Sequence, residues 1–162
     1  MSNIQHTAQG PSIIGTAVGA FLTLVETSPS LPRNYQKVAV TGNSPASGFS
    51  WLHNLDSGSV GQVGNGQGVE SSSSQSLSPM VDVQARVGFT GLSSTAVALS
   101  AMTVGDLFIN GSGQLARKVD VNGVSPPANN SWVVVLATGQ VDPVLSATAF
   151  SRVAGSPVTW LP

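Results

Sequence analysis

Cysteine is absent from this 162-residue chain, and charged residues are scarce. Without cysteine, the chain can form neither disulfides nor thiolate metal sites, and its redox compartment cannot be inferred. Charged residues make up 8% of the sequence, against about 25% in an ordinary soluble domain. The formal net charge of -1 provides no electrostatic footprint for nucleic acid or an anionic membrane, so we expect neither as a partner. Near-zero net charge also promotes association, which indicates a surface that a partner covers.

A hydrophobic run that could span a bilayer is also lacking. The longest apolar stretch, Ile13 to Val25, is interrupted by glycine and threonine and is shorter than the roughly 20 residues of a spanning helix. No basic segment precedes it, as a signal peptide would require. We therefore predict neither a membrane segment nor a secretion signal.

Side chains suited to catalysis are few and scattered. His6 and His53 have no Cys, Asp or Glu at metal-ligand spacing, and we predict that His6 lies in the tail and His53 in a surface or partly buried loop. The glycines of 64–68 lack the Lys and the following helix of a phosphate-binding loop. Arg117-Lys118 is predicted to be a solvated pair or part of an intersubunit ion pair. The seven carboxylates are isolated, so we predict no enzyme, no cofactor and no metal site.

The residues that are abundant favour strands and turns. The chain has 18 Gly and 10 Pro among many Ser, Thr, Asn and Val, a composition that disfavours helices. Strands are predicted at Tyr35–Thr41, Phe49–Leu52, Pro79–Phe89, Ser94–Met102, Val144–Val153 and Val158–Leu161. No βαβ pattern and no internal repeat is predicted, so a parallel sheet is not expected. The predicted fold class is all-β: a small antiparallel β-barrel or sandwich with an extended N-terminal arm.

Composition divides the chain into three parts. Residues 1–55 are predicted to form the N-terminal arm and its strands. Residues 56–78 are rich in Gly and Ser with few bulky apolar groups, so we predict a linker or long loop. Residues 79–162 are predicted to form the small β-barrel domain.

The stretch Met102–Thr138 carries the clearest strand and turn pattern. It contains an apolar run at Leu107–Ile109, an Asn110-Gly111 turn, an alternating segment at Gln114–Val121 and an apolar run at Trp132–Ala137. Asn-Gly suits a tight hairpin because both residues tolerate positive φ. Asp106 and Asp142 are predicted to occupy turns, and Trp132 to lie in the core.

Two segments are predicted to bind a partner. Ser12–Glu26 is apolar on both alternating faces, so both faces must be covered, by the fold or by a neighbouring subunit. A tryptophan and a leucine near the end of the chain either close the barrel or insert into a neighbour. The predicted partner-binding residues are Ile13, Ile14, Val18, Phe21, Leu22, Leu24, Trp160 and Leu161.

The segment Val104–Leu115, VGDLFINGSGQL, resembles the capsid decoration (cement) proteins of tailed bacteriophages, in which such a strand and turn precede a valine-rich strand. The resemblance covers Pro79–Val153. It implies a virion structural protein on the outer capsid surface, a dimer or trimer that bridges subunits of the major capsid protein and has no active-site residues. The first half is longer and more apolar than the short arm of such proteins, and it fits an arm that reaches across subunits. A phage tail or fibre component, or a carbohydrate-binding or adhesion module using Trp51 or Trp160, remains an alternative.

Overall fold

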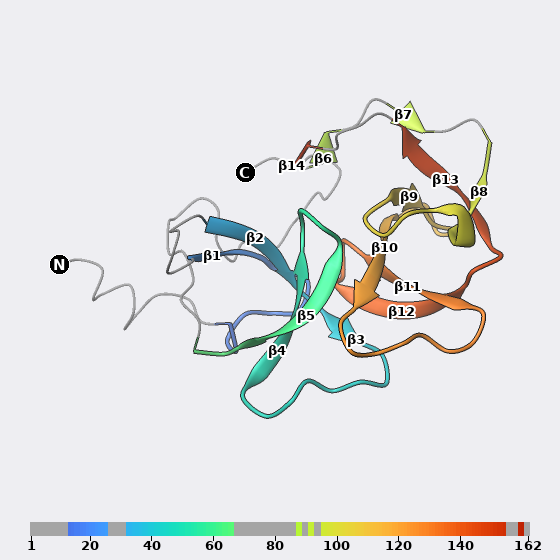
Figure 1. Ribbon diagram of the computed structural model, residues 1–162. Helices are drawn as coiled ribbons and strands as arrows, with labels where there is room; N and C mark the ends of the chain where they lie inside the picture. The colour runs from blue at the N-terminus through green and yellow to red at the C-terminus, as the bar shows by residue number, and fades with distance from the viewer. Residues whose placement is uncertain are drawn as a thin grey trace.

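The structure is a computed structural model that describes residues 13–25, 32–66, 87–88, 91–92, 95–154 and 159–160. It is almost entirely β, which confirms the predicted fold class (Figure 1). One short 3-10 turn, η1 (Leu99–Ala101), is the helical element of the described residues. The strands are β1 (Phe21–Val25), β2 (Pro32–Lys37), β3 (Ala39–Val40), β4 (Phe49–Asn54), β5 (Ser59–Gly64), β6 (Val87–Gly88), β7 (Gly91–Leu92), β8 (Val97–Ala98), β9 (Leu107–Ile109), β10 (Leu115–Val121), β11 (Asn130–Val135), β12 (Gln140–Leu145), β13 (Ala149–Ala154) and β14 (Thr159–Trp160).

The main sheet curls into a barrel. Its hydrogen-bonded order runs β2-β4-β5-β10-β11-β12 and then returns to β3. Only Val38 separates β3 from β2, and the Val38 N–H donates to the Trp51 carbonyl of β4 at 3.1 Å. The continuous segment from β2 to β3 therefore has β4 on one side and β12 on the other, and the strand order closes on itself.

Two of the pairings in this ring are parallel, namely β5 with β10 and β12 with β3. The other ring pairings are antiparallel. The sheet is therefore mixed rather than parallel: most of its pairings are antiparallel, as the predicted antiparallel barrel requires, and the two parallel pairings are an addition that the sequence did not indicate. Parallel neighbours need a long connection, and the parallel pairs here join strands that are far apart in the sequence.

The barrel consists of two equivalent halves. The first half contains β1, β2–β3, β4 and β5, and the second contains β9, β10, β11 and β12, paired in the same order within each half. The two parallel pairings between the halves have the same register after a shift of 81 residues: Ala39 with Gln140 and Val40 with Val141, against Asp120 with Ser59 and Val121 with Val60. The halves are thus related by a pseudo-twofold axis.

The sequence carries the same repeat. Residues 35–66 and 116–147 align without a gap and share 12 identical residues of 32. Trp51 and Trp132 are among them, and each indole N–H donates at 3.0 Å to a backbone carbonyl eight positions earlier. The expectation of no internal repeat was therefore wrong. The identical residues occur singly or in adjacent pairs, spread over strands and turns, so they form no compact motif.

Backbone conformation repeats as well. Gly48 and Asn129 are equivalent, and Asn129, with φ of 63°, is the one non-glycine residue with positive φ in the described part of the chain. Asn is among the few residues that adopt this conformation at low cost. The same turn is therefore built with a different residue in each half.

The segment predicted as an arm is bound to its own barrel. Residues 13–21 are structurally equivalent to residues 99–107, with a shift of 86 residues. β1 pairs with β2 as β9 pairs with β10. The Lys37 ammonium donates to the Ile13 carbonyl at 2.8 Å, and the Lys118 ammonium donates to the Leu99 carbonyl at 2.7 Å. Each lysine thus holds the turn that precedes the first strand of its half. Residues 1–12 lie outside the described residues.

The largest hydrophobic cluster contains residues of both halves. Val38, Val40, Trp51 and Val60 from the first half pack in it with residues of the second, among them Val119, Val121, Trp132 and Val141. Two smaller clusters each belong to one half and are themselves equivalent. They centre on Ile13 with Tyr35 and Leu52, and on Leu99 with Ala116 and Val133. The main core is therefore completed only when the halves meet.

The predicted linker at 56–78 is wrong over its first part. Residues 59–64 form β5, which pairs with β4 and with β10. Val60 is fully buried in the main core, so a strand with a single deeply buried side chain was mistaken for a loop because of its glycines. Residues 67–78 lie outside the described residues. The predicted division at 56–78 also separates β4 from β5, which pair along most of their length.

The Met102–Thr138 stretch forms the predicted strands, with a wider turn than expected. The Asn110 N–H donates to the Gln114 carbonyl at 2.9 Å, so three residues close the hairpin between β9 and β10. The positive φ falls on Gly113, at 79°, rather than on Asn110 or Gly111. The Asn110 side-chain oxygen accepts from the Ser112 and Gln114 N–H groups, each at 2.9 Å. This is the three-residue hairpin that ends on a left-handed residue.

Several other predictions are decided by the structure. Asp106 does close a turn, since its carboxylate accepts from the Thr103 N–H at 3.0 Å. Asp142-Pro143 is not a turn but lies within β12. β12 meets β3 only at Gln140 and Val141, so Pro143 lies past the end of β3, where its missing N–H removes no ladder bond.

The remaining predicted strands are divided in the structure or lie partly outside the described residues. Ser94–Met102 yields the short strand β8 and then η1 rather than one strand. Val144–Val153 is divided between β12 and β13, which are joined by a turn, and Thr159–Trp160 forms β14. Of the predicted strand at Pro79–Phe89, only β6 lies within the described residues, paired with β14. β13 runs outside the ring and pairs with β7, β8 and β9 (Figure 1).

Candidate functional site

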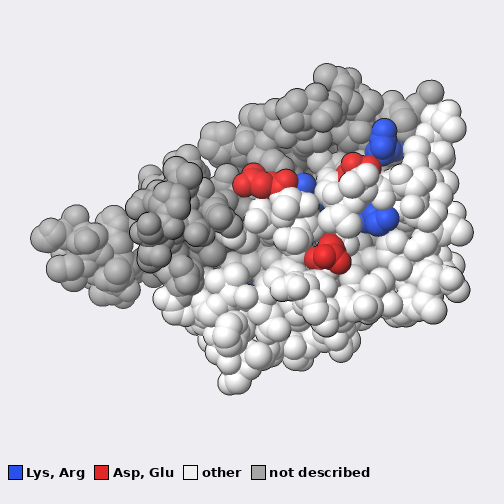
Figure 2. Space-filling view, in the orientation of Figure 1, with Lys and Arg blue, Asp and Glu red and all other residues white. Residues whose placement is uncertain are grey.

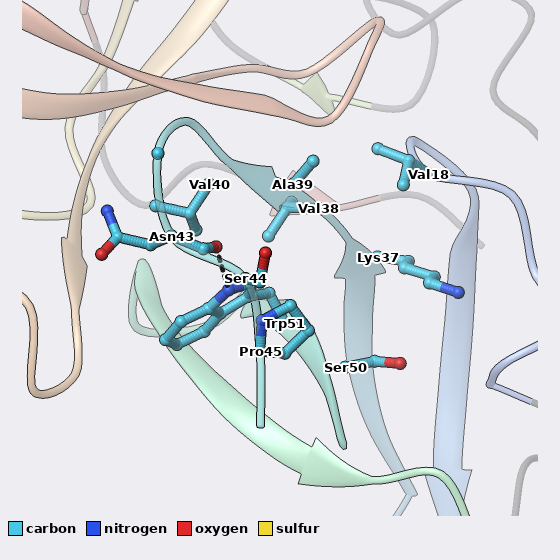
Figure 3. Close-up of a pocket in the computed structure, with 11 residues that line it drawn as sticks. Val18, Lys37, Val38, Ala39, Val40, Asn43, Ser44, Pro45, Ser50 and Trp51 are labelled. Carbon is cyan, nitrogen blue, oxygen red and sulfur yellow. Dashed lines mark hydrogen bonds between the residues drawn. The ribbon is translucent and has the colours of Figure 1, made fainter. Parts of the chain in front are cut away.

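A surface groove lies beside the start of β3 and β4. It has a volume of about 390 Å³, and its lining residues come from the turn before β1, the segment 37–45 and the start of β4 (Figure 3). Trp51 and Pro45 lie together at one end, and Val18 and Lys37 lie at the other (Figure 3). The lining is mostly apolar and backbone, which suits a hydrophobic contact better than a charged ligand.

Three of the polar side chains that line the groove have partners within the chain. The Trp51 indole N–H donates to the Asn43 carbonyl at 3.0 Å. The Lys37 ammonium donates to the carbonyls of Ile13 and Ile14, at 2.8 and 3.3 Å, and burial lowers the pKa of Lys37. The Ser50 hydroxyl donates to the Asn65 side chain at 2.5 Å. These three groups serve the fold and are not free to act on a ligand.

A polar cluster lies inside the barrel, made by Gln36 of β2, His53 of β4 and Arg117 of β10. All three side chains are buried. His53 Nδ1 lies 3.3 Å from Gln36 Oε1, and His53 Nε2 lies 3.1 Å from Arg117 Nη1. Because a guanidinium only donates, Nε2 of His53 must accept and Nδ1 must carry the proton that bonds Gln36. The cluster therefore fixes one neutral tautomer of His53.

Electrostatics agree with this tautomer. Burial, and then the positive charge of Arg117, lower the pKa of His53 well below its ordinary value of 6.5. Burial also lowers the pKa of Arg117 to about 10, while the carboxylates of Asp56 and Asp106 act in the opposite direction. At neutral pH, Arg117 is therefore charged and His53 is neutral.

Gln36 and Arg117 occupy equivalent positions and make equivalent bonds. Gln36 Nε2 donates to the carbonyls of Gly19 and Leu136, at 3.2 and 2.7 Å. Arg117 donates from Nε to the Gly105 carbonyl at 2.8 Å and from Nη1 to the Leu55 carbonyl at 2.7 Å. Each side chain thus bonds one glycine of its own half and one leucine of the other half. No buried side-chain nitrogen or oxygen of the described residues lacks a hydrogen-bond partner, so the cluster joins the halves and leaves no group poised for catalysis.

The cluster corrects two sequence predictions. His53 was expected in a surface or partly buried loop, but it is fully buried in a strand. Arg117 was expected to be solvated or paired between subunits, but it is buried and bonded within the chain. The alternation of side chains along β4 and β10 directs His53 and Arg117 into the barrel. The low content of charged residues gave no reason to expect a buried arginine there. Lys118, on the opposite face, is half-buried and bonds the Leu99 and Met102 carbonyls.

The predicted partner-binding residues divide into two groups. Ile13 and Phe21 are buried in their own barrel and are not available to a partner. Ile14 and Val18 are 69% and 46% exposed. The side chains of Leu22, Leu24 and Trp160, and all of Leu161, lie outside the described residues.

The described residues offer few features for binding a sugar, a metal ion or a membrane. Trp51 exposes 3% of its surface, so its ring face is not available to stack on a sugar; the side chain of Trp160, the other residue of the adhesion alternative, lies outside the described residues. No group of three or more His, Asp or Glu that could hold a metal occurs in the described part of the chain, nor does any described helix have the length and hydrophobicity to cross a membrane. Figure 2 shows few charged side chains on one face of the molecule, with positive and negative groups close together.

Comparison with known proteins gives no relative: no family model, no curated protein and no solved structure matches this chain.

Proposed function

We propose that this protein is a virion structural protein of the capsid decoration type, which binds the outer surface of an assembled shell and bridges subunits of the major capsid protein. The observation that carries the proposal is a pair of exposed valines at equivalent positions, Val18 and Val104. They are 46% and 39% exposed, and each directly precedes a glycine with positive φ that lies two residues before the first strand of its half.

An exposed valine at one site needs no explanation, but the same exposure in both halves favours a binding role. The two positions sit in the same local structure, so the chain presents an exposed valine in the same setting twice. A protein with two equivalent surfaces can contact two copies of the same partner at once, and the second contact then forms at high effective concentration. Bridging of identical capsid subunits can use that arrangement.

Three further properties support a binding role. Ile14 belongs to the same segment before β1 as Val18 and is the most exposed of the large apolar residues described. The chain has six basic and seven acidic residues, so apolar contact rather than charge must supply most of its affinity. The resemblance of Val104–Leu115 to decoration proteins includes one of the two exposed valines.

The test uses undecorated capsids of the tailed phage that encodes the chain. The purified protein is incubated with these shells, and bound protein is measured by co-sedimentation and located by cryo-electron microscopy. We expect ordered density on the outer surface. Val18→Ser and Val104→Ser should each weaken binding by roughly 1–2 kcal/mol, or about 5- to 30-fold, because each removes apolar area from a contact.

Leu145→Ser is the matched control. Leu145 is 60% exposed at the end of β12, and its replacement should leave capsid binding unchanged. Shells that take up no protein at any concentration would refute the proposal. Equal loss of binding in Val18→Ser and Leu145→Ser would show that the paired surface is not the one used.

A further inference from the structure

The interface between the two halves has the contact pattern of a twofold homodimer. In such an isologous interface, residue i of one subunit contacts j of the other, and j contacts i in return. Here β3 contacts β12 in the register in which β10 contacts β5. Gln36 bonds the Leu136 carbonyl, and Arg117 bonds the equivalent Leu55 carbonyl.

Neither half contains the main core by itself. Val38, Val40, Trp51 and Val60 bury their side chains against residues of the second half. The parallel strand pairs, the reciprocal side-chain bonds and the shared core all lie at this one interface. A first half therefore requires a second half, but nothing in these contacts requires both to belong to the same chain.

We infer that the two halves of one barrel can be supplied by two different chains, so that the partner this interface fits is a second copy of the same protein. In the exchanged dimer, residues 13–66 of each chain pair with residues 95–154 of the other. Both barrels then keep every contact described above. This inference is independent of the proposed capsid function.

The length of the connecting chain permits the exchange. The connection from β5 to β6 comprises residues 65–86, which are 22 residues, and a chain of that length can span at most about 75 Å. A 100-residue domain has a radius of gyration of about 13 Å, so the connection can reach an adjacent barrel. Because the contacts are the same in both forms, the balance depends on the effective concentration at which the connection holds the two halves of one chain together, and covalently tethered modules reach values on the order of millimolar. The monomer should dominate at micromolar concentration and the exchanged dimer should form at millimolar concentration.

The absence of cysteine makes the exchange directly measurable. Ser59 and Asp120 are exposed and face each other across the β5–β10 pairing. Full-length chains carrying Ser59→Cys are mixed with full-length chains carrying Asp120→Cys. The mixture is unfolded under reducing conditions, refolded at about 1 mM and then oxidised. A covalent species of twice the 16.4 kDa chain mass on a non-reducing gel is expected, because only an exchanged barrel brings the two cysteines together.

Two controls define the result. Chains with Ser59→Cys mixed with chains with Gln140→Cys should give only background cross-linking, because β5 and β12 are not neighbours. The double variant Ser59→Cys/Asp120→Cys, refolded at micromolar concentration, should close its disulfide within one chain. An intrachain disulfide in the double variant without a covalent dimer in the mixture would overturn the inference.

Light scattering of the unaltered protein measures its molar mass and is a second test, which does not depend on the geometry of introduced cysteines. After refolding at about 1 mM, a fraction with twice the chain mass is expected, and it should persist on dilution because exchange back requires unfolding. If the refolded protein has the monomer mass throughout, the inference is wrong, whatever the cross-linking shows.

Discussion

At the scale of single residues, His53 controls how stability responds to acid. His53 is neutral in the folded barrel because it is buried and accepts a bond from Arg117. Its folded pKa lies well below 6.5, so the unfolded chain binds an additional proton as the pH falls below about 6.5, and the stability contributed by neutral His53 is lost progressively toward the folded pKa. Urea unfolding midpoints measured from pH 7.5 to pH 4.5 should therefore fall with pH.

His53→Val is the informative variant because valine occupies the equivalent position in the second half, at Val134. It should be less stable at pH 7.5 by about 1–3 kcal/mol, because Gln36 and Arg117 each lose a buried partner. Its unfolding midpoint should also change less between pH 7 and pH 5 than that of the parent. An unchanged pH dependence would mean that His53 is not the group that titrates.

Gly58 allows the cost of close packing to be separated from the cost of backbone conformation. Gly58 has φ of 82°, and a Cβ placed there would lie 2.8 Å from the Gly105 Cα. Gly42 has φ of 78° and open space around it. Gly42→Ala should therefore cost only the left-handed conformation, about 1–2 kcal/mol. Gly58→Ala should cost a further 1–3 kcal/mol or so for the steric clash. Equal unfolding free energies for the two variants would contradict this packing.

At the scale of elements, the hairpin between β9 and β10 depends on Asn110 and Gly113. Asn110→Ala removes two side-chain bonds to backbone N–H groups and should lower the free energy of unfolding by about 1–2 kcal/mol. Gly111→Ala is the control, since Gly111 has no positive φ and no atom near the new Cβ, and it should be neutral or slightly stabilising. Urea unfolding of both variants measures the difference. If Gly111→Ala is the more destabilising variant, the turn has a different conformation.

Elements with strong local patterns could be predicted from the sequence, and elements defined by distant partners could not. The apolar runs around Phe108 and Trp132 alternate or persist long enough to indicate strands, and the structure has β9 and β11 there. β5 was missed because its glycines give it no alternation, and only its pairing with β4 and β10 makes it a strand. Pro143 was read as a turn because its tolerance in β12 depends on where β3 ends.

At the scale of the whole molecule, the repeat explains what the sequence did not disclose. The buried cluster contains unlike residues at equivalent positions: Gln36 and Arg117 make the same bonds with different side chains, and His53 corresponds to Val134. Divergence at these inward positions hides the repeat from inspection and breaks the symmetry at the centre of the barrel. The exposed valines could have been identified as a pair only after the two halves were aligned.

The central structural claim is that two equivalent halves form one barrel around one core, so they must unfold together. Trp51 and Trp132 occupy the same position in the two halves and are both buried in the shared core, which makes each a reporter for one half. Two full-length variants are prepared in a Trp160→Phe background, one with Trp51→Phe and the other with Trp132→Phe, and each is unfolded in urea with fluorescence and far-ultraviolet circular dichroism recorded together. We predict that, within each variant, the two signals give one coincident transition, as expected for a single cooperative unit. If the fluorescence transition of either variant is complete at a urea concentration where half of the circular dichroism signal of the folded protein still remains, the halves unfold separately and the account is wrong.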